Sequence, residues 1–307
     1  MDCRGVTRLI THDSCADGLA SAIIIRDALP HVEVVFAQHG TPSLEALPAS
    51  PGLLFCDIAP PRARAGEFVE AGAIVLDHHL HARDIVELFG SRGVFADETL
   101  SPGVSGAMLA YEHVWQPLVP RGYGGGNDLH GFARLVGIRD TWQTRSPGWE
   151  HACDLHAALM GLPRGYWLGS SGSERAMSDD TLELGKLWRA QHTEAVAAVC
   201  YAGTVRLVDA GGRQWAAFPE RARLTSDVAE ALRGRGVAVT CGWFQVVDEG
   251  AVRTVLSLRS DAASALPLDV GALCKSFGGG GHSRAAGCQV SVSDPLVAVR
   301  RVMEAAS

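Results

Sequence analysis

The chain has 307 residues, of which 47% are hydrophobic and 20% charged, so a disordered chain and a fibrous repeat are excluded and two globular domains are expected. Its 27 basic and 34 acidic residues give a net charge of -7, which argues against a broad basic surface that grips long nucleic acid. A short phosphorylated ligand stays compatible with this charge, because bound metal ions would add positive charge.

The sequence carries no sign of export or membrane insertion. Residues 1–14 lack the apolar core of a signal peptide, and no stretch of about 18 apolar residues occurs. The eight cysteines are scattered without a C-x-x-C pair, which favours neither a disulfide framework nor a zinc knuckle. We therefore expect a cytoplasmic protein with no membrane partner.

Short apolar runs alternate with helical stretches in the first half of the chain. The runs are rich in Val, Ile, Leu and Phe and are too continuous for a sheet with one wet face, which is typical of buried parallel strands. Helices of crossover length are expected over 17–29 and 61–71. The rhythm predicts an α/β domain built on a doubly wound parallel sheet. Its expected strands span 6–11, 32–37, 52–57, 72–77 and 92–97.

The second half is more helical at first and then rich in strands. Helices are expected over 105–115 and 129–140, and the Gly- and Ser-rich segment 163–175 is expected to be a loop. A long helix over 179–200 leads to a smaller mixed α/β domain with antiparallel pairing. Its expected strands span 203–209, 213–218, 236–248 and 251–260. The predicted organisation is an N-terminal domain over 1–178, a linker helix over 179–201 and a C-terminal domain over 202–307.

Polar residues collect where three of the predicted parallel strands end. A single strand-end Asp commonly caps the next helix, but five polar residues from three strands are hard to explain by folding needs alone. Ligands bind beyond the carboxyl ends of parallel strands, and carboxylate and imidazole groups bind Mn, Fe, Mg or Zn. The pattern therefore predicts a metal site at this edge. Its residues are His12 after the first strand, Asp57 at the end of the third, and Asp77, His78 and His79 at the end of the fourth.

Five short segments along the chain form a recognisable series. They are HDSCADG at 12–18, an isolated strand-end Asp57, DHH at 77–79, GIRDT at 137–141 and GGGHSRAAG at 279–287. The first four resemble the motifs of DHH-family phosphoesterases, and the fifth is similar to the signature of the DHH-associated C-terminal domain. This family includes RecJ-like exonucleases, nanoRNases that also dephosphorylate pAp, cyclic-dinucleotide phosphodiesterases and family II pyrophosphatases.

The resemblance implies a two-metal centre in the N-terminal domain. His12 would bind the first ion and Asp17 the second, and Asp57 would bridge the two. His78 and Asp140 would complete the second position. The implied cofactors are two divalent ions, with Mn expected.

The resemblance also implies roles for the other two residues of the DHH triplet. Asp77 would orient its neighbours, and His79 would face the scissile phosphate and donate to a non-bridging oxygen. Independently of the family, two metal ions that share a hydroxide would hold it in line with phosphorus, which predicts direct hydrolysis without a covalent intermediate.

Cys15 departs from the family pattern. The first motif usually contains Asp-x-Asp-Gly, whereas this chain has Cys15-Ala16-Asp17-Gly18, so a thiol stands where a carboxylate of the first metal position is expected. A thiolate suits Fe or Zn better than Mn or Mg, and these ions are therefore alternative cofactors. Two further alternatives stay open: a first metal held by His12 and Asp57 alone, and a structural role for Cys15.

The glycine run near the C-terminus is a candidate substrate-binding segment. Successive glycines let backbone N–H groups approach a phosphate, and the residues after them could grip a terminal phosphate or stack on a base. A simple turn is the alternative explanation. The candidate residues are Gly279, Gly280, Gly281, His282 and Arg284.

These features predict a metal-dependent phosphoesterase acting on a phosphodiester or 3′-phosphate of short oligonucleotides or small nucleotides, with no long duplex as a partner. One alternative is a phosphoanhydride hydrolase that uses pyrophosphate or polyphosphate. Another is a nucleotide-binding sensor whose turnover is impaired by the change at Cys15. The oligomeric state stays open, with a homodimer as one outcome.

Overall fold

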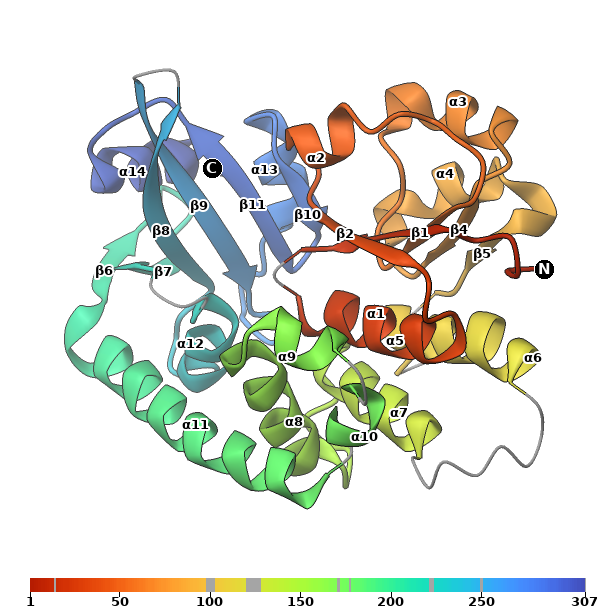
Figure 1. The fold of residues 1–307 in the computed structure, drawn as a ribbon. Coiled ribbons are helices and arrows are strands. Elements are labelled where there is room, and N and C mark those ends of the chain that lie inside the picture. The colour runs from red at the N-terminus through yellow and green to blue at the C-terminus, as the bar shows by residue number, and fades with distance from the viewer. Residues whose placement is uncertain are drawn as a thin grey trace. The chain divides into compact units, whose positions relative to one another are not determined.

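The chain folds into two compact units, Met1–Ala190 and Gln191–Ser307 (Figure 1). The computed structural model describes residues 1–13, 15–97, 103–119, 128–169, 172–176, 178–220, 224–248 and 251–306. The division between the units falls within helix α11 (Asp179–Ala198), in the segment expected to link two domains.

The first unit is built on a five-stranded sheet in the order β2-β1-β3-β4-β5, and all four pairs of neighbouring strands are parallel. The register pairs Leu9 of β1 with Leu54 of β3, so their side chains share a face. The doubly wound parallel sheet expected from the apolar runs is thereby confirmed. Its strands are β1 (Arg8–His12), β2 (Glu33–Ala37), β3 (Leu53–Cys56), β4 (Ile74–Asp77) and β5 (Gly93–Phe95).

Helices cover both faces of this sheet (Figure 1). Because successive strand residues point to opposite faces, Leu9 packs into a core with α1, α5, α7 and α8, whereas Ile10 packs into a core with α2, α3 and α4. The α-helices are α1 (Ala16–Ala28), α2 (Pro42–Glu45), α3 (Ala65–Glu70), α4 (Arg83–Glu87), α5 (Gly106–Ala110), α6 (Gln116–Leu118), α7 (Leu129–Asp140), α8 (Trp149–Gly161), α9 (Arg164–Leu168) and α10 (Gly172–Ala176). Short 3₁₀ turns are η1 (Arg62–Arg64), η2 (Leu80–Ala82) and η3 (Gly90–Arg92), and π turns are η4 (Tyr111–Trp115) and η5 (Val199–Gly203).

The expectation of a loop over 163–175 is wrong, because the described part of this segment contains α9 and the start of α10. Trp167 of α9 and Ala176 of α10 are both buried in the core beneath α1. Burial of a Trp side chain stabilises a short helix that the local Gly and Ser content does not favour. Tertiary packing therefore overrode the local composition here.

The second unit contains a six-stranded mixed sheet in the order β10-β11-β9-β8-β7-β6, in which only β7 and β8 pair in parallel among the described strands. Helices α13 and α14 cover one face, and α12 packs on the other. The elements are β6 (Val205–Val208), β7 (Gln214–Pro219), α12 (Thr225–Leu232), β8 (Val239–Asp248), β9 (Ala251–Ser260), α13 (Val270–Ser276), β10 (Gly280–His282), β11 (Ala285–Val290) and α14 (Pro295–Glu304). The expected mixed α/β unit is confirmed. No helix in the described ranges combines the length and the apolar character that a bilayer crossing requires.

Candidate metal centre

The predicted strand-end residues do converge at one edge of the first sheet. His12 is the last residue of β1, Asp57 directly follows β3, and Asp77 is the last residue of β4. β1 and β3 are neighbours in the sheet. The strand that follows β1 in the chain, β2, lies toward one edge, and the strand that follows β3, β4, lies toward the opposite edge. Such a switch point opens a crevice in an open α/β sheet, so the cluster lies where this fold usually binds ligands.

Asp17 joins the cluster from the first turn of α1 and is fixed by another helix. Its carboxylate accepts backbone N–H groups from Gly106 at 2.6 Å and Ala107 at 2.8 Å, at the start of α5. A Cβ on Gly106 would lie 2.5 Å from the Cβ of Asp57, so only glycine lets α5 approach this closely. Gly106 thus holds Asp17 in place without carrying any reactive group, a contact that the sequence does not indicate.

One group of ligand atoms surrounds the imidazole of His78. Its Nε2 lies 3.2 Å from Asp57 Oδ1 and 3.6 Å from carboxylate oxygens of both Asp17 and Asp140. His78, Asp17 and Asp57 are almost fully buried, whereas Asp140 is partly exposed. Ligand atoms of Asp17, His78 and Asp140 lie within 4.8 Å of one another, and so do those of Asp57, His78 and His79, so the surroundings of His78 suit a divalent cation.

A second group lies on the other side of the same carboxylate. Ligand atoms of His12, Cys15 and Asp57 lie within 4.8 Å of one another. His12 Nδ1 is 3.9 Å from Asp57 Oδ2, an oxygen that is buried and has no hydrogen-bond partner among the described residues. Asp57 therefore turns one oxygen toward each group. Its left-handed backbone, with φ of 63°, turns the chain at the end of β3.

Burial dominates the protonation of this cluster. Burial, with the nearby Asp17 carboxylate, raises the pKa of Asp57 well above its ordinary value. Burial also raises the pKa of the Cys15 thiol to about 12, and the Asp140 and Asp17 carboxylates act in the same direction. Partial burial lowers the pKa of His12 to about 4, and the neighbouring His79 adds to this effect. The metal-free cluster is therefore short of positive charge, which a bound cation would supply.

Asp77 holds the DHH segment by accepting three hydrogen bonds on a single oxygen. The donors are the backbone N–H groups of His78 at 2.7 Å and His79 at 3.0 Å, and His79 Nδ1 at 2.7 Å. Burial opposes both charges, but their mutual attraction outweighs it and raises the pKa of His79 to about 9. His79 is consequently an imidazolium at neutral pH, close to His78, with 4.4 Å between ring centroids.

Asp140 occupies an unfavourable local position. It is the last residue of α7, where the negative end of the helix dipole disfavours a carboxylate. Trp142 follows in the left-handed region, with φ of 56°, at a helix end where glycine is usual. The N–H of Gln143 donates to Ile138 O at 2.9 Å and closes the helix there. Local preferences do not explain an Asp here, whereas a bound cation would compensate its charge.

The glycine-rich segment of the second unit forms a hairpin instead of an open loop. Gly280–His282 is strand β10, which pairs antiparallel with β11, and His282 lies opposite Ala285. A Cβ on Gly279 would lie 2.1 Å from Gly287 O, so close strand packing accounts for this glycine. Both alternatives from the sequence, an open anion-binding loop and a simple turn, omitted this strand. The predicted phosphate-binding role stays a prediction.

Arg259 is a partly buried cation next to this hairpin that the sequence analysis missed. It pairs with Ala285 in the β9–β11 register. Its guanidinium donates to Ser226 Oγ at 2.9 Å and to Leu258 O at 2.8 Å, and burial lowers its pKa. No sequence motif singled out this Arg, because its position depends on strand register.

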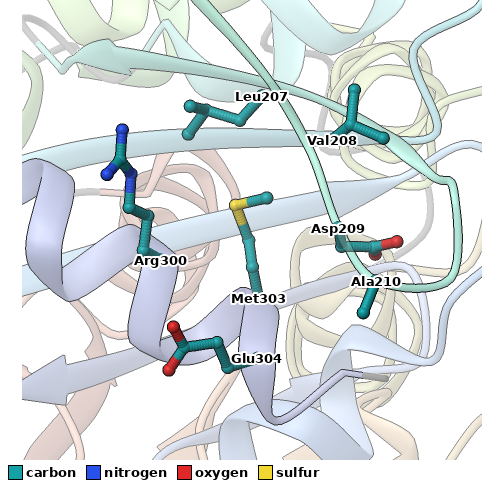
Figure 2. A pocket seen from close by; sticks show the side chains of 7 residues that line it. All are labelled: Leu207, Val208, Asp209, Ala210, Arg300, Met303 and Glu304. Carbon is teal, nitrogen blue, oxygen red and sulfur yellow. The ribbon is translucent and has the colours of Figure 1, made fainter.

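A pocket of about 320 Å³ lies elsewhere in the second unit (Figure 2). Its lining includes no residue of the predicted site, and one of its carboxylates, Asp209, already accepts hydrogen bonds from Arg213 and Trp215. The lining residues are Leu207, Val208, Asp209, Ala210, Arg300, Met303 and Glu304.

Fold and site together define a two-unit α/β protein with a carboxylate and imidazole cluster at a parallel sheet edge. The sequence matches no protein-family model and no curated protein. Among solved structures, the pGpG-specific phosphodiesterase PggH from Vibrio cholerae is 18% identical over 97% of both chains, with a TM-score of 0.52. The DHH domain of a member of the s1p family of ribosomal proteins is 11% identical over 98% of this chain and 86% of that one, with a TM-score of 0.62.

RecJ from Thermus thermophilus, in complex with Mn²⁺, is 18% identical over 98% of this chain and 52% of its own, with a TM-score of 0.49. The likeness to PggH and to the DHH domain shows a shared fold. The fold expected from the DHH resemblance is thereby confirmed.

Proposed function

We propose that this protein is a metal-dependent phosphoesterase that hydrolyses a phosphodiester or 3′-phosphate of short oligonucleotides or small nucleotides. The observation that carries the proposal is the buried Asp57 carboxylate, whose two oxygens face two different ligand groups. Such a carboxylate suits a bridge between two divalent ions. The fold shared with a pGpG-specific phosphodiesterase supports a nucleotide substrate.

Each proposed ion has its own set of ligands. When bound, two divalent ions would lower the pKa of a water and offset the charge on a phosphate. Because most donors are nitrogen or oxygen atoms, Mn is the first candidate, and Fe or Zn are alternatives because of Cys15. His12, Cys15 and Asp57 would hold the first ion. Asp17, His78 and Asp140 would hold the second, with Asp57, close to His78, as the bridge.

Within this proposal His79 acts on the substrate. Its imidazolium, held by Asp77, would donate to a non-bridging phosphate oxygen and stabilise the charge that develops there. Asp77 acts through His79 and touches no substrate atom. Its hydrogen bonds to the His78 and His79 backbone also fix the direction in which both imidazoles leave the strand.

The glycine-rich segment of the second unit has a proposed role in substrate binding. We assign this role to the candidate segment Gly279–Gly281 with His282 and Arg284, and to Arg259 beside it. Arginine donors suit a terminal phosphate, and a short substrate needs no long basic track. This agrees with the net charge of -7.

The experiment is a substrate panel. Metal-free protein is reloaded with Mn²⁺, Fe²⁺ or Zn²⁺ and incubated with 5′-labelled di- to pentanucleotides, pAp and cyclic dinucleotides. We expect metal-dependent product from at least one of these. Asp57→Asn should abolish it, because the bridging oxygen is lost, whereas Glu67→Gln, which alters an exposed carboxylate paired with Arg64, should not.

The other outcomes of the panel are equally definite. No product from any nucleotide with any metal overturns the proposal. Phosphate release from pyrophosphate alone would identify a phosphoanhydride hydrolase, and tight nucleotide binding by calorimetry without turnover would identify a sensor. Equal activity of Asp57→Asn and the unchanged protein would show that the assigned metal ligands are wrong.

A further inference from the structure

Cys15 is an unusual residue for the start of a helix. It precedes α1 as its N-cap residue, with an extended backbone, and the backbone N–H groups of Asp17 and Gly18 face its sulfur. Ser, Thr, Asp and Asn are the residues that stabilise this position best, and Cys is not among them. The thiol also lies with His12 and Asp57, in a group whose ligand atoms are within 4.8 Å of one another.

A second observation points to a cation in this group. Asp57 Oδ2 is buried and has no hydrogen-bond partner among the described residues, and His12 Nδ1 is 3.9 Å away from it. A buried carboxylate oxygen without a donor is costly unless a proton or a cation compensates it. If Cys15 only filled space in the core, there would be no need for an unpaired carboxylate oxygen beside it.

The two ligand groups differ in chemical softness. The group around His78 offers three carboxylates and one imidazole, all of them hard or intermediate donors. The group at Cys15 offers sulfur, imidazole nitrogen and one oxygen. Soft thiolate ligands select thiophilic ions, while carboxylates suit Mn²⁺ and Mg²⁺.

We infer that Cys15 makes the two metal positions unequal: the position at His12, Cys15 and Asp57 selects a thiophilic ion such as Zn²⁺, Fe²⁺ or Co²⁺, and the position at Asp17, His78 and Asp140 takes a hard ion. This inference rests on the proposed two-metal site. It makes the native centre a mixed-metal one, in which Cys15 serves as a ligand and a determinant of metal choice. The protein then needs two different ions for full occupancy.

Cobalt spectroscopy tests this without measuring activity. Co²⁺ is titrated into reduced, metal-free protein, and the near-ultraviolet sulfur-to-cobalt charge-transfer band is recorded. We expect the band to appear, to disappear when one equivalent of Zn²⁺ is added, and to persist in excess Mg²⁺ or Mn²⁺. A spectrum without the band, or displacement of Co²⁺ by Mn²⁺ as readily as by Zn²⁺, overturns the inference.

Three variants locate the sulfur. Cys15→Ser should lose the band, whereas Cys153→Ser, which removes a half-buried thiol in α8, should keep it. Cys15→Asp should lose the band and bind Mn²⁺ at the first position about tenfold more tightly, a change of the size typical for substitutions around a metal site. A band that survives in Cys15→Ser contradicts the inference.

The test also separates this inference from the proposed function. Turnover of a nucleotide by protein that shows no cobalt–sulfur band would leave the phosphoesterase standing and reject the role of Cys15. The band without turnover of any substrate would establish the thiolate site and reject the phosphoesterase.

Discussion

His79 Nδ1 donates a 2.7 Å hydrogen bond to the same Asp77 oxygen that accepts the backbone N–H groups of His78 and His79. Burial disfavours the ionised carboxylate, but the positive charge and hydrogen bonds of His79 outweigh it and lower the pKa of Asp77 to about 2. The pair is therefore ionised across the neutral pH range. One buried carboxylate fixes the direction and the charge of the His79 ring.

Replacing Asp77 with Asn should lower activity by about 10–100-fold, because Asn keeps the shape of the side chain but loses the charge that holds His79. The pKa of His79 should fall toward its ordinary value of about 6.5, which NMR titration of the metal-free protein measures. Asp84→Asn is the control, since Asp84 is an exposed carboxylate that pairs with Arg62. An unchanged His79 pKa in Asp77→Asn would contradict the assigned pairing.

The buried Asp57 should make the metal-free protein less stable as pH rises. Its pKa is raised in the folded state, so above about pH 4 the unfolded chain loses a proton that the folded chain retains. The stability associated with the protonated carboxyl is present below the ordinary Asp pKa and is lost as pH rises through the folded pKa. Chemical denaturation at several pH values should show this slope, and Asp57→Asn should reduce it.

Divalent metal should reverse that loss of stability. A ligand that binds only the folded protein adds about 2.7 kcal/mol when its free concentration is about 100 times Kd. Thermal denaturation with and without Mn²⁺ or Zn²⁺ measures the gain, and Asp57→Asn should show little of it. If the metal stabilised the variant and the unchanged protein equally, the assigned ligands would be wrong.

Strand-end residues were predictable because their positions follow from elementary sheet geometry. Parallel strands that run together must end at one edge, so His12, Asp57 and the DHH segment could be expected to meet there. Asp17 and Asp140 could not be found this way, because they come from the first turn of α1 and the last turn of α7. Only the resemblance to the DHH family pointed to these two.

Contacts between distant segments escaped the sequence analysis for a physical reason. Gly106 donates to Asp17 across 89 positions of the chain, and nothing local to Ser105-Gly106 indicates that partner. The burial of Trp167 in the core likewise depends on where α1 lies. The position of Arg259 beside the glycine-rich hairpin follows from the β9–β11 register, which the sequence does not indicate.

Gly106→Ala should destabilise the first unit and weaken metal binding. The added Cβ would lie 2.5 Å from Asp57 Cβ and 2.9 Å from Asp17 Oδ2, so α5 or both carboxylates must move. Overpacking of this kind costs about 1–3 kcal/mol. Gly66→Ala is the matched control, because Gly66 lies in α3 with nothing within 4 Å of a new Cβ. Denaturation midpoints and Co²⁺ titration measure both effects; equal stability of the two variants would refute the close approach.

Asp209 should stabilise the second unit independently of the metal centre. Burial opposes its ionisation, but hydrogen bonds from Arg213 Nε at 2.7 Å and Trp215 Nε1 at 2.9 Å lower its pKa. Because the folded pKa is lowered, this stability is present above the ordinary Asp pKa and is lost as pH falls through the folded value. Asp209→Asn should cost about 1.5–3 kcal/mol, the contribution of a hydrogen bond to a charged group. Hydrogen exchange of β7 amides at neutral pH measures the loss, while metal binding should not change. Unchanged exchange would show that the carboxylate contributes nothing there.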